Sequence, residues 1–201
     1  MATYYVRQDG NDSNTGLGST TGLAWRTIQK ALGATGIGSG DTVYIAPGHY
    51  NELVTVGGTY SAETQIIGDP TASQFIGVNA GFVRHSQYPA TNNTAATAGQ
   101  LLGGTGKSYL HFKNIYFEYA AQTNASSFIL SNARFTKLTS CVFVNNQRNT
   151  SVTGDLAIYG PSGQTANTVV TNCIFYNHRY LELTGGLASG DQSSITNSAM
   201  E

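Results

Sequence analysis

The sequence predicts an all-β fold built as a parallel β-helix, in which each coil of the chain lies on the coil before it. A hexapeptide pattern recurs: apolar, polar, Asn or Ser, small or apolar, variable, then Phe or Met. The copies are FKNIYF at 112–117, LTSCVF at 138–143, VTNCIF at 170–175 and ITNSAM at 195–200. Between copies lie Gly-, Asn-, Ser- and Thr-rich corners and short apolar runs, without a helical pattern long enough for a crossover. Stacked coils, about 4.8 Å apart, explain why like residues recur at like positions.

Equivalent positions of successive coils are expected to form rows of stacked side chains. The last position of the hexapeptide is predicted to form one interior row and the fourth position a second. The third position is expected at a corner, where an Asn side chain can bond the neighbouring coil. The rows are Phe117, Phe143, Phe175 and Met200; Ile115, Cys141, Cys173 and Ser198; and Asn114, Ser140, Asn172 and Asn197. The two cysteines are therefore expected to pack as small hydrophobic residues, with a disulfide as the alternative.

Residues 1–39 are predicted to form an amino-terminal strand, an Asx-rich turn and a capping helix. In WRTIQKALG, Trp25, Ile28 and Leu32 recur at helical spacing, with Thr27 as the N-cap and Gly33 as the stop. One short helix in an all-β chain is expected to cover an end of the stack, where strand edges would otherwise be exposed.

Residues 40–201 are predicted to form the coils, in a single domain with the cap. The segment GDTVYIAPGHYNELVTV, at 40–56, alternates as a strand, turns at Pro47-Gly48 and resumes as a strand. The polar segment 71–100 is expected to leave the stack as a long loop, with QFIGV at 74–78 as a candidate strand within it.

Composition excludes several classes of partner. Charged residues make up 10% of the chain, Gly accounts for 24 residues, and the net charge is −1 with a pI near 6.4. No basic surface for nucleic acid or an anionic membrane is expected, and no apolar run reaches the roughly 18 residues of a membrane span. The start MATYYVRQDG has no signal-peptide pattern, so ordinary secretion is not expected.

The amino-terminal segments resemble a known family. YYVRQDGNDSNTG, WRTIQKAL and GDTVYIAPGHYNE are similar to the amino-terminal signature of pectate-lyase-like right-handed parallel β-helices. These occur in polysaccharide lyases and in many bacteriophage tailspike and tail-associated proteins. The resemblance implies a right-handed parallel β-helix with a short N-terminal capping α-helix, but the fold hosts several activities.

The string DGNDSNTG, at 9–16, is a candidate calcium loop. Asp9, Asn11, Asp12 and Ser13 supply oxygen atoms at close spacing, but the central Gly and the final acidic ligand of an EF-hand are missing. An Asx-rich turn joining the first strand to the helix is the simpler interpretation. No other metal or cofactor is expected.

Catalytic groups are not apparent in the repeats. No carboxylate occupies the same hexapeptide position in two adjacent copies, so a glycosidase pair cannot be placed. His49 and His85 are assigned to a turn and to the polar segment. His178, Arg179 and Tyr180 form the most site-like cluster, a candidate for glycan binding, although a solvated loop is the simpler interpretation.

The fifth position of the hexapeptide is expected to point outward. Tyr116, Val142, Ile174 and Ala199 would form an outward apolar row that packs against another subunit, with trimers as one arrangement, or lies under a loop of this chain. The last coil has no cap comparable to the amino-terminal helix, so a partner chain or further sequence is expected to cover that end.

Two functional interpretations follow. The first is a non-catalytic structural or adhesive virion component, a bacteriophage tail- or capsid-associated β-helix released by lysis, which assembles with other subunits and contacts a surface polysaccharide. The alternative is a polysaccharide lyase or glycan depolymerase with the same fold. A passive carbohydrate-binding module would share the twelve tyrosines without any catalytic demand.

Overall fold

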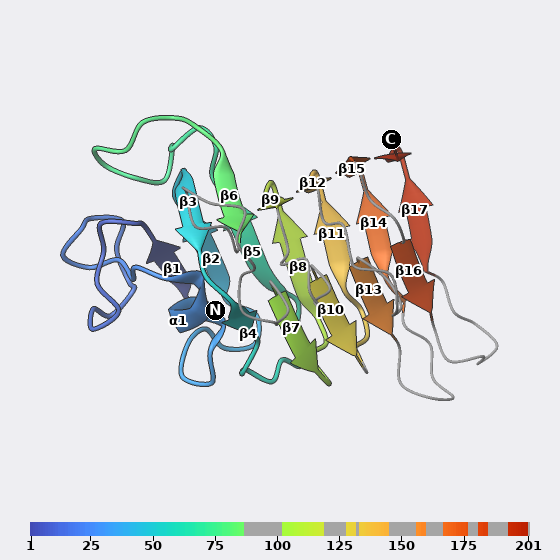
Figure 1. Ribbon diagram of the computed structural model, residues 1–201. Coiled ribbons are helices and arrows are strands. Elements are labelled where there is room, and N and C mark those ends of the chain that lie inside the picture. The colour runs from blue at the N-terminus through green and yellow to red at the C-terminus, as the bar shows by residue number, and fades with distance from the viewer. Residues whose placement is uncertain are drawn as a thin grey trace.

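The computed structural model describes residues 1–86, 102–118, 128–131, 133–144, 156–159, 167–176, 181–184 and 193–200. Three parallel sheets form a stack of coils that runs from the amino-terminal cap to the last coil (Figure 1). Sheet A contains, in order, β1 (Thr3–Val6), β2 (Thr42–Ile45), β5 (Thr64–Gly68), β8 (Leu110–Lys113), β11 (Lys137–Thr139), β14 (Val169–Thr171) and β17 (Ser194–Thr196).

Sheets B and C complete the coils. Sheet B contains β3 (Gly48–Asn51), β6 (Val83–Ser86), β9 (Tyr116–Glu118), β12 (Val142–Val144), β15 (Ile174–Tyr176) and β18 (Ala199–Met200). Sheet C contains β4 (Val54–Thr55), β7 (Leu102–Thr105), β10 (Phe128–Ser131), β13 (Leu156–Tyr159) and β16 (Leu181–Thr184). Each later coil supplies one strand to each sheet, as β7, β8 and β9 do, which confirms the predicted right-handed parallel β-helix.

The corner between sheets A and B bends at the third hexapeptide position. Asn114, Ser140, Asn172 and Asn197 have φ angles of 55°, 53°, 54° and 47°. Asn tolerates this left-handed conformation better than most residues, which explains its recurrence. The side chain of Asn114 also donates from Nδ2 to the carbonyl of Gly68 on the previous coil, at 3.4 Å.

The predicted interior rows lie between the sheets. Phe117, Phe143 and Phe175 are buried and stack face to face, with ring centroids 5.0 and 5.1 Å apart. Met200 continues the register of the row, but 62% of its surface is exposed. Cys141 and Cys173 are free and buried, so they pack as small apolar residues as expected.

The amino-terminal cap contains helix α1 (Ile28–Leu32). Thr27 is its N-cap, with Oγ1 accepting from the Lys30 amide at 3.0 Å, and Gly33 follows its last residue. Trp25, expected on the helix, instead precedes it and stacks on Tyr4 with ring centroids 4.9 Å apart. No helix in the described part of the chain has the length and apolar character needed to cross a membrane.

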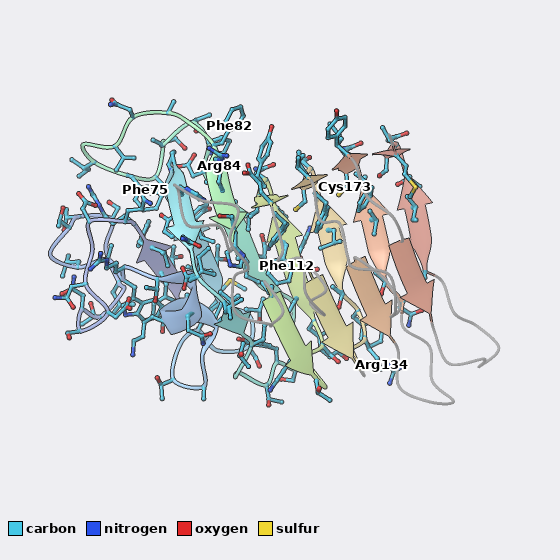
Figure 2. The ribbon with its side chains drawn as sticks, in the orientation of Figure 1. Phe75, Phe82, Arg84, Phe112, Arg134 and Cys173 are labelled. Atoms are coloured by element: carbon cyan, nitrogen blue, oxygen red, sulfur yellow. The ribbon has the colours of Figure 1, made fainter. Side chains whose placement is uncertain are left out.

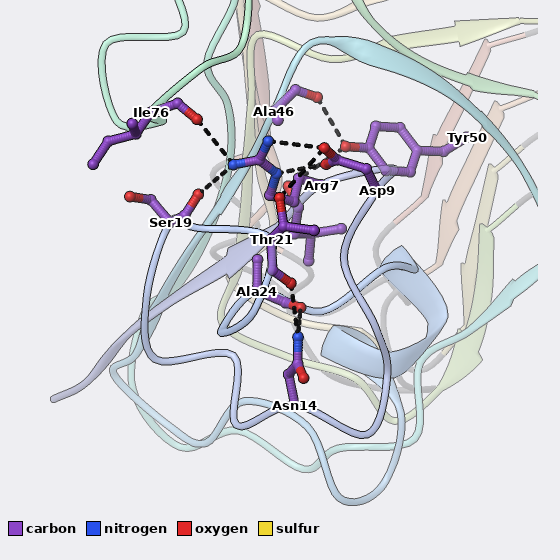
Figure 3. A network of polar contacts seen from close by, with 10 residues as sticks. Arg7, Asp9, Asn14, Ser19, Thr21, Ala24, Ala46, Tyr50 and Ile76 are labelled. Carbon is purple, nitrogen blue, oxygen red and sulfur yellow. Dashed lines mark hydrogen bonds and ion pairs between the residues drawn. The ribbon is translucent and has the colours of Figure 1, made fainter.

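A buried arginine, Arg7, connects segments of the amino-terminal cap to the loop before β6 through hydrogen bonds (Figure 3). Arg7 is 4% exposed and forms a two-point ion pair with Asp9, at 2.6 and 3.0 Å. Its Nη1 also donates to the carbonyls of Ser19 and Ile76, at 2.8 and 3.0 Å. The guanidinium thus links the first strand, the amino-terminal loop and the segment before β6, using donor groups that would be costly to bury unpaired.

The segment expected to be one long loop, 71–100, is partly a strand. β6 pairs with β3 and β9 in sheet B, whereas residues 74–78, the candidate strand, form turns. Phe75 lies within this segment, and Phe82 directly precedes β6 (Figure 2). The sequence did not predict β6 because His85, a polar residue, occupies an inward-facing position of this strand where an apolar residue is expected. Residues 87–100 lie outside the described residues.

Candidate functional site

A polar cleft of about 660 Å³ lies where the amino-terminal cap meets the first coil. Strand β3 and the residue after it form one wall, and the Asx-rich turn and the start of α1 form the other. The lining residues are Gln8, Asp12, Arg26, Thr27, His49, Tyr50, Asn51 and Glu52. A hollow on which several ionisable groups converge is a candidate ligand site.

Glu52 is the most perturbed acid of this cleft. Its Oε1 and Oε2 accept hydrogen bonds from the amides of Ile28 and Gln29, at 2.8 and 2.9 Å, at the start of α1. Burial raises the pKa of Glu52, the amide bonds partly oppose that shift, and the negative charge of Asp12 raises the pKa further. A carboxyl group with a raised pKa is the form that general acid catalysis requires.

Asp12 is the second carboxylate of the cleft. Its Oδ1 accepts from the amides of Arg26 and Thr27, at 2.8 and 3.0 Å, and its Oδ2 accepts from Thr27 Oγ1 at 2.8 Å. Asp12 and Glu52 therefore both hold the beginning of α1, where unpaired amides favour negative charge. The same contacts fix both side chains in position at the cleft wall.

The candidate calcium residues do not converge. Asp9 pairs with Arg7, Asn11 Oδ1 accepts from the Ser13 amide at 2.9 Å, and Asp12 faces the helix. This arrangement matches the simpler interpretation, an Asx-rich turn. Among the described residues, no group of three His, Cys, Asp or Glu side chains is placed to hold a metal ion.

Histidine and amide groups complete the cleft. The backbone carbonyl of His49 accepts a hydrogen bond from Gln8 Nε2 at 2.5 Å. The imidazole Nε2 of His49 contacts Ser86 Oγ on β6. Tyr50 points inward instead, since its hydroxyl donates to the Ala46 carbonyl at 3.0 Å. The exposed Arg26 adds a cation at the rim. The cleft thus offers acids, an imidazole, amides and a guanidinium, which suit a ligand rich in hydroxyl groups.

The other predicted site residues fall elsewhere. His178, Arg179 and Tyr180, the candidate glycan-binding cluster, lie outside the described residues. Tyr116, Val142, Ile174 and Ala199 do align in register on sheet B, and Ile174 is 45% exposed. At the amino end of this row, Phe82 contacts Tyr116 with ring centroids 4.7 Å apart, so a segment of this chain covers part of it.

The sequence alone did not identify the cleft. Its residues come from three segments, 8–12, 26–27 and 49–52, and none of them belongs to the hexapeptide repeat. The one available signal was the capping requirement, because a predicted helix start attracts acidic side chains. That rule does not say which of the eleven acidic residues in the chain arrive there.

A parallel β-helix with a polar cleft beside its cap is the class of protein that these observations define. Residues 24–200 match the family model described as Rhamnogalacturonase A/epimerase, pectate lyase-like. The chain belongs to this family, and the resemblance seen in the sequence is confirmed. The match supports a carbohydrate-active fold and gives no support to a bacteriophage or structural role. No curated protein matches the chain in sequence.

Solved structures share the fold at low sequence identity. A rhamnogalacturonan lyase superposes with a TM-score of 0.59 and 17% identity, over 100% of this chain and 50% of that one. The GH136 lacto-N-biosidase from Eubacterium ramulus, as native protein, gives a TM-score of 0.59 and 13% identity, over 99% of this chain and 40% of that one. This chain therefore spans half or less of the length of these structures. At such identity the likeness concerns the fold alone.

Proposed function

We propose that the chain belongs to a glycan-cleaving protein, a polysaccharide lyase or depolymerase, and that the cleft beside the cap takes part in catalysis. The observation that carries the proposal is that Glu52, His49 and Asp12 line one polar cleft, with Glu52 half-buried and its pKa raised by loss of solvent and by the charge of Asp12. Two converging ionisable groups are the minimum for acid-base cleavage of a glycosidic bond. In this scheme Glu52 protonates the leaving oxygen.

The remaining cleft residues have supporting roles in this scheme. His49 lines the same cleft and is the candidate base, which takes a proton from a sugar carbon in an elimination or from the attacking water in a hydrolysis. Arg26 and Gln8 bind sugar hydroxyl or carboxylate groups. The family membership supports a carbohydrate substrate. The printed names of the structural neighbours suggest two substrates to try first, rhamnogalacturonan and a glycan that contains lacto-N-biose.

The proposal is tested by measuring cleavage. The protein is incubated with rhamnogalacturonan, polygalacturonate and a lacto-N-biose glycan, and new reducing ends and unsaturated products are followed. Glu52→Gln is expected to lower the rate at least ~100-fold, the low end for loss of a general acid. Asp69→Asn is the matched control, because Asp69 also accepts a backbone amide, from Gln74 at 2.7 Å, but lies outside the cleft.

Two results would refute parts of this proposal. If none of the polymers yields products, glycan cleavage by this chain is refuted. If a polymer is cleaved and Glu52→Gln matches Asp69→Asn in rate, the cleft is not the catalytic site. Circular dichroism of both variants separates a catalytic loss from unfolding.

A second candidate function is that of a structural subunit that packs sideways against other subunits, as in the virion component expected from the sequence. The outward apolar row on sheet B supports the lateral packing. Val142, Ile174 and Ala199 align there, with Tyr176 50% exposed beside them. Sedimentation analysis tests it: a homo-oligomer that Ile174→Lys dissociates supports lateral packing, and a monomer at all concentrations refutes it.

A further inference from the structure

A second polar cluster lies on the outward face of sheet A, away from the cleft. It is formed by Glu63 and Gln65 at β5, His111 and Lys113 on β8, and Lys137 and Thr139 on β11. The strand register places Gln65, His111 and Lys137 in one row, and Lys113 beside Thr139 in the next. This "sheet A cluster" brings together two of the four lysines of a chain with few charges.

The protonation of the cluster follows from its hydrogen bonds. His111 Nδ1 lies 3.1 Å from Glu63 Oε1, and its Nε2 lies 2.9 Å from Thr139 Oγ1. Burial lowers the pKa of His111, and the hydrogen bond from Lys137 lowers the pKa of Glu63, so a neutral imidazole faces an ionised carboxylate. The carboxylate accepts a hydrogen bond from Nδ1–H, so Nε2 carries no proton and accepts a hydrogen bond from the Thr139 hydroxyl. The remaining lone pairs of that hydroxyl can accept from a ligand.

The charges of the cluster leave one cation without an anionic partner. Lys137 Nζ pairs with Glu63 Oε2 at 2.5 Å, which neutralises that carboxylate. Lys113 Nζ donates to the uncharged Gln65 Oε1 at 3.0 Å, and within the described residues no carboxylate lies in ion-pair range of it. The half-exposed ammonium of Lys113 can therefore receive an anion.

A line of hydroxyl groups continues from this cation along the stack. Thr139, Thr171 and Thr196 occupy matching positions on β11, β14 and β17, and the last two hydroxyls lie 3.2 Å apart. A ligand along this line meets first a cation and then hydroxyls carried by successive strands, which lie about 4.8 Å apart. A sugar chain that carries a carboxylate matches this order of groups.

We propose that the sheet A cluster is a binding subsite for an acidic glycan, with Lys113 contacting a uronate carboxylate and the threonine line contacting sugar hydroxyls. The inference rests on the proposed carbohydrate function but concerns a different surface from the cleft. Glu63 and His111 act as positioning residues, because they orient the Thr139 hydroxyl and do not contact the ligand.

The test measures binding without turnover. Calorimetric titration with a short oligogalacturonate compares the wild-type chain, Lys113→Met and Lys107→Met. Lys107 is the matched control, a half-buried lysine whose Nζ donates to the Gly57 carbonyl at 3.1 Å on another face. Lys113→Met is expected to weaken binding about fivefold, as for one partly solvated ion pair, and Lys107→Met less than twofold. Thr139→Val, similar in shape, is expected to weaken binding in the same direction.

Specific outcomes overturn the inference. Three outcomes would each refute an acidic-sugar subsite: a neutral galacto-oligosaccharide binds as tightly as the oligogalacturonate, equimolar inorganic phosphate displaces the oligogalacturonate, or Lys113→Met and Lys107→Met weaken binding equally. Repeating the titration on Glu52→Gln separates the two proposals. If the wild-type chain binds the oligogalacturonate but cleaves none of the polymers, this subsite is upheld and the catalytic proposal fails. If the wild-type chain cleaves a polymer and Lys113→Met leaves binding unchanged, the catalytic proposal stands and this subsite is refuted.

Discussion

At the scale of single residues, the burial of His85 is the observation that differs most from the sequence prediction. The sequence places it among polar residues, yet the ring is 1% exposed and packs edge-on against Phe117, with centroids 5.8 Å apart. Its Nε2 lies 3.0 Å from the Glu52 carbonyl, to which it donates. Burial lowers the pKa of His85 to about 4, so the imidazole is neutral throughout the physiological range.

This histidine is expected to make folding stability depend on pH. Between pH 6.5 and about 4 the unfolded chain binds a proton at position 85 that the native chain does not, so stability falls as pH falls. By linkage the loss approaches ~3 kcal/mol. His85→Gln is expected to flatten this part of the profile. Urea unfolding of both proteins at several pH values in that window measures the difference, and parallel profiles would contradict the prediction.

At the scale of elements, the corner between sheets A and B decides where each coil bends. Asn172 holds a φ of 54° between β14 and β15. Asn172→Val is expected to lower the free energy of unfolding by about 1–2 kcal/mol, because a β-branched residue is strained in this conformation. Asn172→Gly is expected to change little. Thr171→Val, at the neighbouring extended position, is the control, and equal losses in both valine variants would show that the corner carries no strain.

The same corner explains how much of the fold the sequence predicts. The positions of Asn114 and Phe117 recur in later coils as Asn or Ser and as Phe or Met, because the backbone bend and the interior row repeat with every coil. These features were predicted correctly, as was the capping helix with Thr27 at its start. β6 was missed because its inward residue is His85, which breaks the apolar alternation on which strand prediction depends.

The candidate site was less predictable for a physical reason. Glu52 and Asp12 are 40 positions apart, and their proximity to α1 depends on how the cap folds over the first coil. The sheet A cluster likewise depends on register, since Lys113 meets Thr139 only when β8 and β11 pair as they do. Repeats reveal contacts that recur in every coil, whereas both of these groupings occur once.

At the scale of the whole molecule, the stack makes stability a local property. Each strand pairs only with the strands of adjacent coils, as β12 does with β9 and β15. Stacked-repeat proteins are therefore described by the stability of each coil and its interfaces with neighbours. A defect is expected to weaken its own and adjacent coils more than distant ones.

Phe143→Ala tests this behaviour. Phe143 is fully buried between Phe117 and Phe175, so truncation is expected to cost about 3–5 kcal/mol. Hydrogen exchange is expected to accelerate in β11, β12, β14 and β15, while β1 and β2 at the cap keep their protection.

The matched control is Phe75→Ala, which removes a buried ring that packs on Tyr5 with centroids 5.8 Å apart, at the cap. Its effect is expected at β1 and β2, the reverse of the Phe143 pattern. If both variants accelerate exchange uniformly from cap to last coil, the molecule unfolds as one cooperative unit. In that case the cap and its cleft share the stability of the whole stack, and the nearest-neighbour description is wrong for this chain.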